Sequence, residues 1–423
     1  MRFTLLALSV AASIISGCGG SGSGSSSDPV TVDPDPVTVE PEPTPPIDNT
    51  PTTNSSIFRE LVGGGVHMCG ITPDDALYCW GEDAVGETGI AQNVEKRSLR
   101  PTKVADLPPL KQVVADFGRT CAVDEANLVW CLGIGRNGWG DDASERDIPM
   151  QPYQMFELAQ IDRLAMSQDA VCAQQLGASM YCWGNNADNN LNVASDSTYV
   201  VFPSEFTWGD LDKSSSVAMA SGSTCLLPES GIPYCFGYNH NAGLGTGSEN
   251  DHIVTPEPVV MPDNIQFSEV VAGFGYFCGV SQDKEVYCWG YYGESSDNNV
   301  ELIKAPKKVD AIDNVESLTA GYNGGCALTS SGQVKCFGGN ETGQLLRQRS
   351  SSGWVNEAVT IPLPGKAVAL ASSEYFNCAI GDEAFDGDVI CWGDIASEDY
   401  LNPDPDVDRN YFGTIRLEKA IHP

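Results

Sequence analysis

The sequence is poor in positive charge and in histidine. It contains 23 Lys and Arg against 57 Asp and Glu, a formal net charge of −34 over 423 residues. Proteins that bind nucleic acid neutralise its phosphates with Lys and Arg, so this balance excludes a nucleic-acid partner. The four histidines are His67, His240, His252 and His422. No Ser or Cys nucleophile motif accompanies them, so we expect no catalytic residues.

Metal and phosphate motifs are missing as well. There is no Cys-x-x-Cys, no glycine-rich phosphate loop and no Gly-x-Ser-x-Gly. The four histidines are too few to complete zinc sites with the many cysteines. We therefore expect no cofactor and no metal ligands.

One acidic segment keeps calcium open as an alternative. Asp404, Asp406 and Asp408 alternate as oxygen ligands do in calcium-binding loops. However, Arg409 stands where an EF-hand loop requires glycine, and Ile415 where it requires glutamate. The segment is therefore predicted to be a solvated loop.

Fourteen of the fifteen cysteines form seven pairs. They are Cys69 and Cys79, Cys121 and Cys131, Cys172 and Cys182, Cys225 and Cys235, Cys278 and Cys288, Cys326 and Cys336, and Cys378 and Cys391. Nine residues separate the members of six pairs and twelve those of the last, and successive first cysteines lie 48 to 53 residues apart. A period of about 50 residues predicts a propeller, a solenoid or an array.

The residues around each pair predict strands and tight turns. Short alternating segments are separated by Gly, Ser and Asn, with no helical period. Cys326 and Cys336 lie symmetrically about Ser331, so a turn there places them opposite one another in a hairpin. Opposed residues of antiparallel strands are close enough for a disulfide. We predict seven disulfides, one per unit, each adding roughly 3 kcal/mol of stability.

A large apolar residue follows the second cysteine of every pair, and glycine follows it. These residues are Trp80, Leu132, Trp183, Phe236, Trp289, Phe337 and Trp392. A bulky group once per unit, at a strand end, is predicted to pack between neighbouring units. The alternative is a functional row of aromatic residues around the ring.

The chain resembles the RCC1-like repeat family over residues 57–423. The motifs Cys326-Ala-Leu, Val334-Lys-Cys336-Phe-Gly and Asn340-Glu-Thr-Gly-Gln-Leu345 follow its repeat, and Pro101-Thr-Lys-Val104 follows its outer strand. Leu132 departs from the family pattern, which has an aromatic residue there. The resemblance implies an all-β fold, a seven-bladed β-propeller of four-stranded blades, with one hairpin disulfide in each.

The ends of the repeat region predict how the ring closes. The first unit begins at Phe58, which we interpret as the middle of a unit. The chain ends with Gly413-Thr-Ile-Arg-Leu-Glu-Lys419, which resembles an outer strand. One terminus is therefore expected to complete a blade that the other begins.

Residues 1–18 have the pattern of an export signal. Arg2 precedes an apolar run over residues 3–15, which is too short to span a membrane. Ile15-Ser-Gly-Cys18 resembles the bacterial lipobox, which implies that Cys18, the one unpaired cysteine, is lipidated. Gly19 in place of Asp implies sorting to the outer membrane, facing the periplasm or the surface. An ordinary cleaved signal is the alternative.

Residues 19–56 are rich in Gly, Ser, Pro and acidic residues, which predicts a disordered, extended linker. The remaining residues, 57–423, still contain 51 acidic and 22 basic residues. Export also agrees with the predicted disulfides, because disulfides persist in oxidising compartments.

The segment before each first cysteine varies most between units, and seven equivalent turns should gather on one face of the ring. Loops carry function, and aromatic and Arg side chains are favoured at interfaces. The candidate partner-binding residues are therefore Phe117, Arg119, Phe274, Tyr276, Tyr322, Tyr375 and Phe376. Alternatively, these rings fill the central channel or cover blade edges.

Together these features predict a monomeric, non-catalytic, protein-binding propeller, held at the cell envelope by its lipid alone. Its partner would be another envelope or extracellular protein. One alternative is carbohydrate or cell-wall binding through exposed aromatic rings. The other is a lyase or hydrolase, which a histidine clustered with carboxylates at the channel mouth would favour. An aromatic mouth would favour binding.

Overall fold

The structure, a computed structural model, describes residues 58–393 and 412–413. The gaps within this part are residues 84, 90–96, 134–150, 156–157, 178, 195–196, 207–210, 212–213, 215, 263–264, 291–302, 341–342, 347–354, 383–384 and 386–388. The chain divides into residues 1–52 and 53–423, and all described residues belong to the second unit. The export signal, Cys18, the whole linker at 19–56 and the acidic segment at 404–408 therefore lie outside the described residues.

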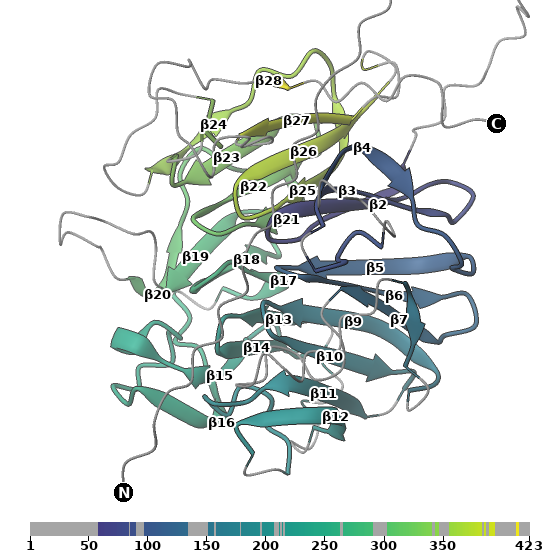
Figure 1. Cartoon of the computed structure of the whole chain (residues 1–423). Helices are drawn as coiled ribbons and strands as arrows, with labels where there is room; N and C mark the ends of the chain where they lie inside the picture. The colour runs from purple at the N-terminus through teal and green to yellow at the C-terminus, as the bar shows by residue number, and fades with distance from the viewer. Residues whose placement is uncertain are drawn as a thin grey trace, which may run out of the picture. The chain divides into compact units, whose positions relative to one another are not determined.

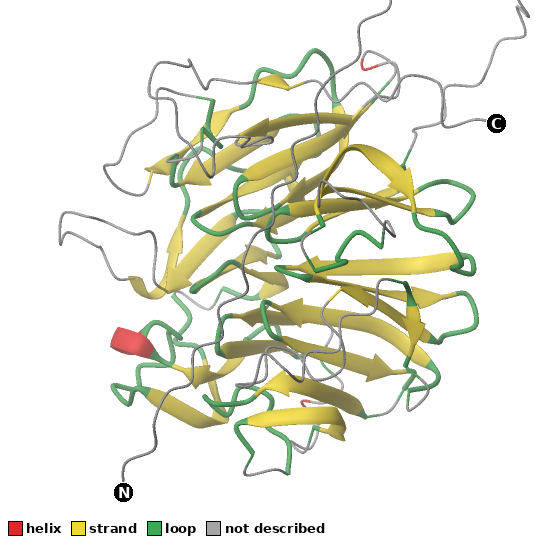
Figure 2. Cartoon of the chain, in the orientation of Figure 1, coloured by secondary structure: helices red, strands yellow, loops and turns green. Residues whose placement is uncertain are grey.

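Seven four-stranded antiparallel sheets follow one another along the chain, each built from four consecutive strands (Figure 1). We number them as blades 1 to 7. Blade 1 comprises β1 (Glu60–Gly63), β2 (His67–Ile71), β3 (Leu77–Glu82) and β4 (Arg97–Lys103). The described residues are almost wholly strand and loop, with a short 3₁₀ helix at His240–Ala242 (Figure 2).

The other blades repeat this plan. Their strands are β5 (Leu110–Asp116), β6 (Arg119–Asp124), β7 (Val129–Gly133) and β8 (Tyr153–Gln154) in blade 2; β9 (Ile161–Ser167), β10 (Ala170–Gln175), β11 (Met180–Asn185) and β12 (Tyr199–Glu205) in blade 3; β13 (Ser216–Ala220), β14 (Ser223–Leu227), β15 (Tyr234–Tyr238) and β16 (His252–Pro258) in blade 4; β17 (Phe267–Ala272), β18 (Tyr276–Ser281), β19 (Val286–Gly290) and β20 (Ile303–Lys308) in blade 5; β21 (Val315–Ala320), β22 (Gly324–Thr329), β23 (Val334–Gly338) and β24 (Val355–Thr360) in blade 6; and β25 (Ala367–Ser372), β26 (Phe376–Gly381), β27 (Val389–Gly393) and β28 (Phe412–Gly413) in blade 7.

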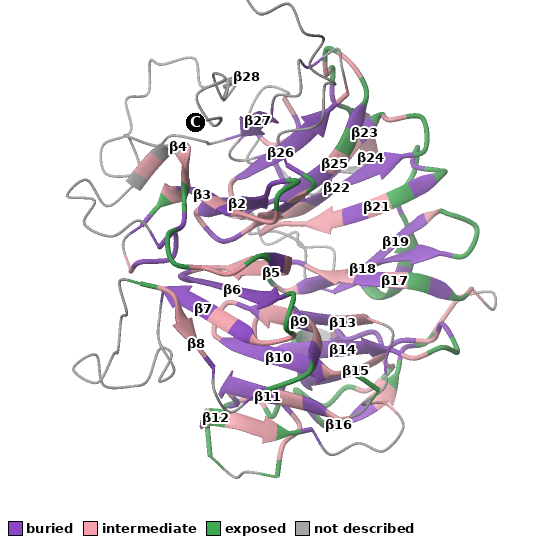
Figure 3. Ribbon diagram, turned by 90° about the vertical axis from the view of Figure 1, so that its right-hand side faces the viewer, coloured by how far each residue is buried: buried purple, intermediate pink, exposed green. Residues whose placement is uncertain are grey.

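The first strand of each blade contacts the first strand of the next, and β25 contacts β1, so the seven blades close into a ring (Figure 3). The Glu374 N–H donates to the Gly65 carbonyl across the junction of blades 7 and 1, at 3.1 Å. A buried apolar cluster that includes Phe58, Trp80 and Phe376 fills the same junction. These contacts confirm the seven-bladed all-β fold.

The expected exchange between the termini is wrong. Gly413 pairs with Cys391 within blade 7, and blade 1 is complete from β1 onward. The structural unit starts at its innermost strand, so Phe58 stands at the beginning of a blade and not in its middle. The ring is closed by the packing of two whole blades.

The cysteine pairing is confirmed in all seven blades, where each bond joins the second and third strands. The bonded pairs, in blade order, are Cys69 and Cys79, Cys121 and Cys131, Cys172 and Cys182, Cys225 and Cys235, Cys278 and Cys288, Cys326 and Cys336, and Cys378 and Cys391. Their Cα atoms lie 4.0–4.1 Å apart. All fourteen cysteines are buried, so the bonds lie inside the blades.

The large residue after the second cysteine packs between blades, as predicted. Trp392 of blade 7 belongs to an apolar cluster with Val334 and Leu345 of blade 6, and its indole N–H donates to the Gln344 carbonyl at 2.9 Å. Leu132 of blade 2 likewise belongs to a cluster with blade 1 residues. These large side chains are therefore buried between blades. The alternative, a functional row of aromatic residues around the ring, does not hold.

Candidate docking site at the channel mouth

The turns between the first and second strands of all seven blades meet at one end of the central channel. They enclose a cavity of about 140 Å³. Its walls include small residues such as Gly63, Ala115 and Ala272, because seven innermost strands converge there, and Met166 and Met219 also line it. A Cβ on Gly63 would lie 2.0 Å from the Ser372 carbonyl oxygen, so this wall has no room for a larger side chain.

One side of this mouth is aromatic. Phe274, Tyr322 and Tyr375 come from the turns of blades 5, 6 and 7 and form what we call the aromatic crescent. The ring centroids of Phe274 and Tyr322 are 4.5 Å apart, and those of Tyr322 and Tyr375 are 6.5 Å apart. Phe274 is 36% exposed, and the two tyrosines are half-buried. Exposed rings held together at a rim are typical of interface anchors.

The other side of the mouth is acidic. Asp116 ends β5, Asp169 lies in the turn after β9, and Glu374 lies in the turn after β25. All three carboxylates are half-buried. Burial is the main cause that raises the pKa of Asp116 to about 7, and the charges of Glu374 and Asp169 also raise it.

Hydrogen bonds from neighbouring groups only partly offset the raised pKa values of these three carboxyl groups. The Phe117 N–H donates to Asp116 Oδ1 at 2.7 Å, which stabilises the ionised form. Burial raises the pKa of Glu374, against a side-chain hydrogen bond from Tyr375. Burial also raises the pKa of Asp169, although its Oδ2 accepts from Asn185 Nδ2 at 2.6 Å.

Four of the seven candidate binding residues lie at this mouth or beside it: the crescent and Phe117, which is half-buried next to Gly65. The structure buries the other three, which are therefore withdrawn from the candidate surface. Phe376 is 3% exposed in the cluster between blades 7 and 1. Tyr276 is 1% exposed, and its hydroxyl donates to the Gly321 carbonyl of blade 6 at 3.2 Å.

Arg119 is the third buried candidate, at 4% exposed. Its positive charge lowers the pKa of Asp116 and of Asp169, and its side chain hydrogen-bonds to Tyr199. The guanidinium therefore lies beneath the acidic side of the mouth and supports it from within.

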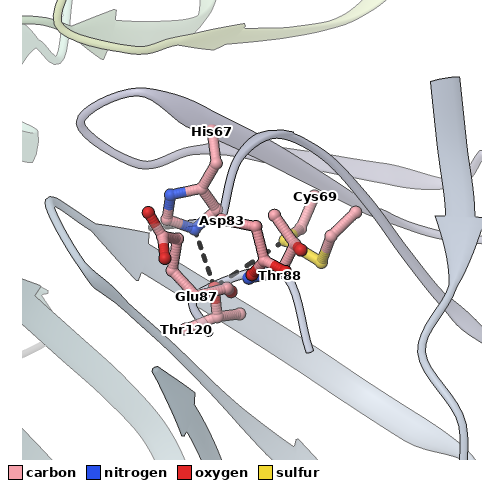
Figure 4. Close-up of a disulfide and its surroundings, with 7 residues drawn as sticks. His67, Cys69, Asp83, Glu87, Thr88 and Thr120 are labelled. Atoms are coloured by element: carbon pink, nitrogen blue, oxygen red, sulfur yellow. Dashed lines mark hydrogen bonds between the residues drawn. A yellow bond between two sulfur atoms is a disulfide. The ribbon is translucent and has the colours of Figure 1, made fainter. Parts of the chain in front are cut away.

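His67 is fully buried at the junction of blades 1 and 2, beside the Cys69–Cys79 disulfide (Figure 4). The Thr120 hydroxyl donates to the Glu87 carbonyl at 2.8 Å, so its oxygen accepts from His67 Nε2–H at 2.8 Å. Burial lowers the pKa of His67 to about 4, so the ring is neutral at physiological pH. This histidine joins two blades and is not available for proton transfer at the mouth.

The three mouth carboxylates were not among the residues predicted from the sequence. A signal was present, because Asp116 and Glu374 immediately precede the selected aromatic residues Phe117 and Tyr375. No cluster of three or more His, Cys, Asp or Glu that could hold a metal occurs among the described residues. The same part of the chain contains no helix long and apolar enough to cross a membrane.

Known sequences share this repeat. Residues 315–344 match the family model of the regulator of chromosome condensation (RCC1) repeat. The ultraviolet-B receptor UVR8 of Arabidopsis thaliana is 23% identical over 359 residues, which cover 83% of this chain and 80% of the receptor. The regulator of chromosome condensation of Xenopus laevis is 21% identical over 338 residues, which cover 74% of this chain and 78% of that protein.

Solved structures share the fold. The crystal structure of Prp20p from Saccharomyces cerevisiae, reported with its binding properties to Gsp1p and histones, superposes with a TM-score of 0.64 at 17% identity. The match covers 77% of this chain and 83% of that one. Human WBSCR16 gives a TM-score of 0.63, also at 17% identity, over 74% of this chain and 84% of its own. At such identities the likeness shows the propeller fold alone.

Proposed function

Because the chain is an RCC1-like β-propeller, we propose that it is a non-catalytic, monomeric, protein-binding module of the cell envelope. The observation that carries this proposal is the aromatic crescent of Phe274, Tyr322 and Tyr375 at the mouth of the central channel. A related structure, that of yeast Prp20p, is reported with binding to other proteins, which supports protein recognition as a use of this fold.

A catalytic role has less support. A histidine among the mouth carboxylates would favour the lyase or hydrolase alternative, but His67 is fully buried and neutral at the junction of blades 1 and 2. Proton transfer needs a group within hydrogen-bond reach of the substrate. The mouth therefore fits binding better than chemistry.

Cross-linking tests the proposed surface. The full chain, carrying a photo-reactive amino acid in place of Gln168 at the mouth, is incubated with an envelope extract of its source cells, with and without Ca²⁺. We expect one protein partner whose yield falls at least tenfold when Phe274→Ala and Tyr322→Ala are combined. Phe202→Ala is the matched control, because Phe202 is 58% exposed on the outer strand β12. Retention of a glycan and of no protein would overturn the proposal.

The envelope location is a separate part of the proposal and rests on the sequence of residues 15–18. We expect the full-length product to partition into detergent and to carry acyl chains on Cys18. Cys18→Ser should move the protein to the aqueous phase and remove the acyl mass from its N-terminal peptide. An N-terminal peptide of unmodified mass in the wild type would contradict lipidation and leave protein binding unaffected.

A further inference from the structure

Two rings of the aromatic crescent and two carboxylates of the acidic side line the same cavity. Asp116 and Glu374 line it together with Phe274 and Tyr322. No Lys or Arg occurs among the described residues that line it. The nearby Arg119 is buried, so the surface presented to a partner is negative and aromatic.

This combination is complementary to a cation with an apolar neighbour. A guanidinium or ammonium group forms charge-assisted hydrogen bonds with carboxylates. It is also attracted to the faces of aromatic rings. The side chains of Arg and Lys have long apolar stems that pack on rings while their charged ends reach acidic groups. A cation at the mouth would relieve the repulsion between Asp116 and Glu374, each of which is half-buried beside the other.

The size of the cavity decides between a small-molecule ligand and a protein side chain. Small-molecule pockets usually enclose about 300–1,000 Å³. The mouth encloses about 140 Å³, and Gly and Ala residues form much of its lining. It has room for one long side chain, while the flanking residues of the same loop rest on the rim.

Resting on the proposed protein-binding function, we infer that the channel mouth receives a loop or chain end of the partner that presents an arginine or lysine. The cation contacts Asp116 and Glu374, and the residues beside it pack on the aromatic crescent. The net charge of −34 adds long-range attraction for such a basic segment.

Binding of this kind has a pH signature. The charged groups that face Asp116 are Glu374, Asp169 and Arg119. Since the pKa of Asp116 is about 7, a cation must displace its proton at low pH. Only the ionised fraction of Asp116 binds well, so the affinity for a basic peptide should rise by about tenfold between pH 6 and 8.

Selection from a phage-displayed library of random heptapeptides on the immobilised full chain tests the inference. We expect Arg and Lys to be enriched several-fold over the starting library. The best selected peptide, made synthetically, should bind the double variant Asp116→Asn/Glu374→Gln at least tenfold more weakly. Asp283→Asn makes the same chemical change on the exposed β18–β19 turn at the opposite end of the blade and should bind normally.

The outcomes separate this inference from the proposed function. Selected peptides without basic residues that are lost on Phe274→Ala/Tyr322→Ala would overturn the inference and leave protein binding at the mouth intact. Selected peptides that bind both mouth variants as tightly as the wild type would overturn both the inference and the proposed function. If the double carboxylate variant fails to fold by circular dichroism, Glu374→Gln alone is measured. A pH-independent affinity for the wild type would then contradict the inference.

Discussion

The glycine after each buried large residue has a left-handed backbone in all seven blades, with φ between +89° and +115°. In blades 1, 3, 4, 5 and 6 it stands at a β-bulge between the third and fourth strands, for example between Cys182 and Gly184. A Cβ on Gly184 would lie 2.2 Å from the Asp169 carbonyl oxygen, within the turn that forms the acidic side of the mouth. A larger residue in place of this glycine would therefore disturb both the bulge and the turn that carries Asp169.

Replacing this glycine should be costly. We expect Gly184→Ala to lower the free energy of unfolding by about 2–3 kcal/mol, since it adds both backbone strain and a clash. Gly177→Ala is the matched control: Gly177 has φ +64°, but nothing lies within 4 Å of its Cβ position, so strain alone should cost about 1 kcal/mol. Urea unfolding followed by fluorescence measures both, and equal losses would contradict the clash.

The raised pKa of Asp116 predicts a pH-dependent stability. Folding favours the protonated carboxyl, so its contribution is fully present below the usual pKa near 4 and is lost as pH rises through about 7. Asp116→Asn should therefore raise the free energy of unfolding by about 1–2 kcal/mol at pH 8 and change it little at pH 4. Thermal unfolding at both pH values tests this, and a gain of equal size at pH 4 would contradict it.

The placement of the aromatic candidates was only partly predictable. Phe274 and Tyr322 lie four residues before a first cysteine and fall in the turn, where Phe274 is exposed and Tyr322 is half-buried. Arg119 and Tyr276 lie two residues before Cys121 and Cys278, so strand alternation puts them on the same face as the buried sulfur atoms. Treating the whole segment as one loop concealed this difference, because the end of the turn depends on backbone hydrogen bonds that the spacing does not show.

At the scale of the element, the second and third strands were the most predictable part of the blade. A ten-residue separation with a tight turn at its centre leaves one register, and the structure pairs Cys326 with Cys336 in it. The last hairpin also pairs its two cysteines directly despite its longer loop. Phe385 of this loop fills the space beside Gly381. The fourth strand was less predictable, since its partner lies across a bulge and its connecting loop differs between blades.

Removing one hairpin disulfide should destabilise the ring without opening it. The double variant Cys326→Ala/Cys336→Ala is expected to lose roughly 3 kcal/mol of unfolding free energy, because the unfolded chain regains the freedom of one closed loop. Denaturant unfolding measures the loss. Alkylation of the unreduced, unfolded wild type checks the premise: the fourteen paired cysteines should stay unlabelled, and labelling of any of them would contradict the pairing.

At the scale of the molecule, the blade number followed from counting repeats, but the point of closure did not. A repeat that returns every 50 residues or so has no intrinsic beginning, so any of its four strands can be the first in the chain. The structure starts with the innermost strand β1, and β28 completes its own blade. The mouth was equally hidden from the sequence, since it brings together turns that are about 50 residues apart and differ in composition.

Because β1 and β28 each pair within their own blade, no described segment connects blades 7 and 1, whereas the chain runs directly from one blade to the next at the six other junctions. Thermal fluctuations can part these two blades without stretching any connection, which makes this seam the first place where the circle opens. Amides of β1 and β25 should then exchange with deuterium faster than those of β9 and β13, as mass spectrometry of peptic fragments would detect. Equal protection of these four strands would contradict early opening at this junction. It would mean that the packing of Phe58, Trp80 and Phe376 fully compensates for the absent chain connection.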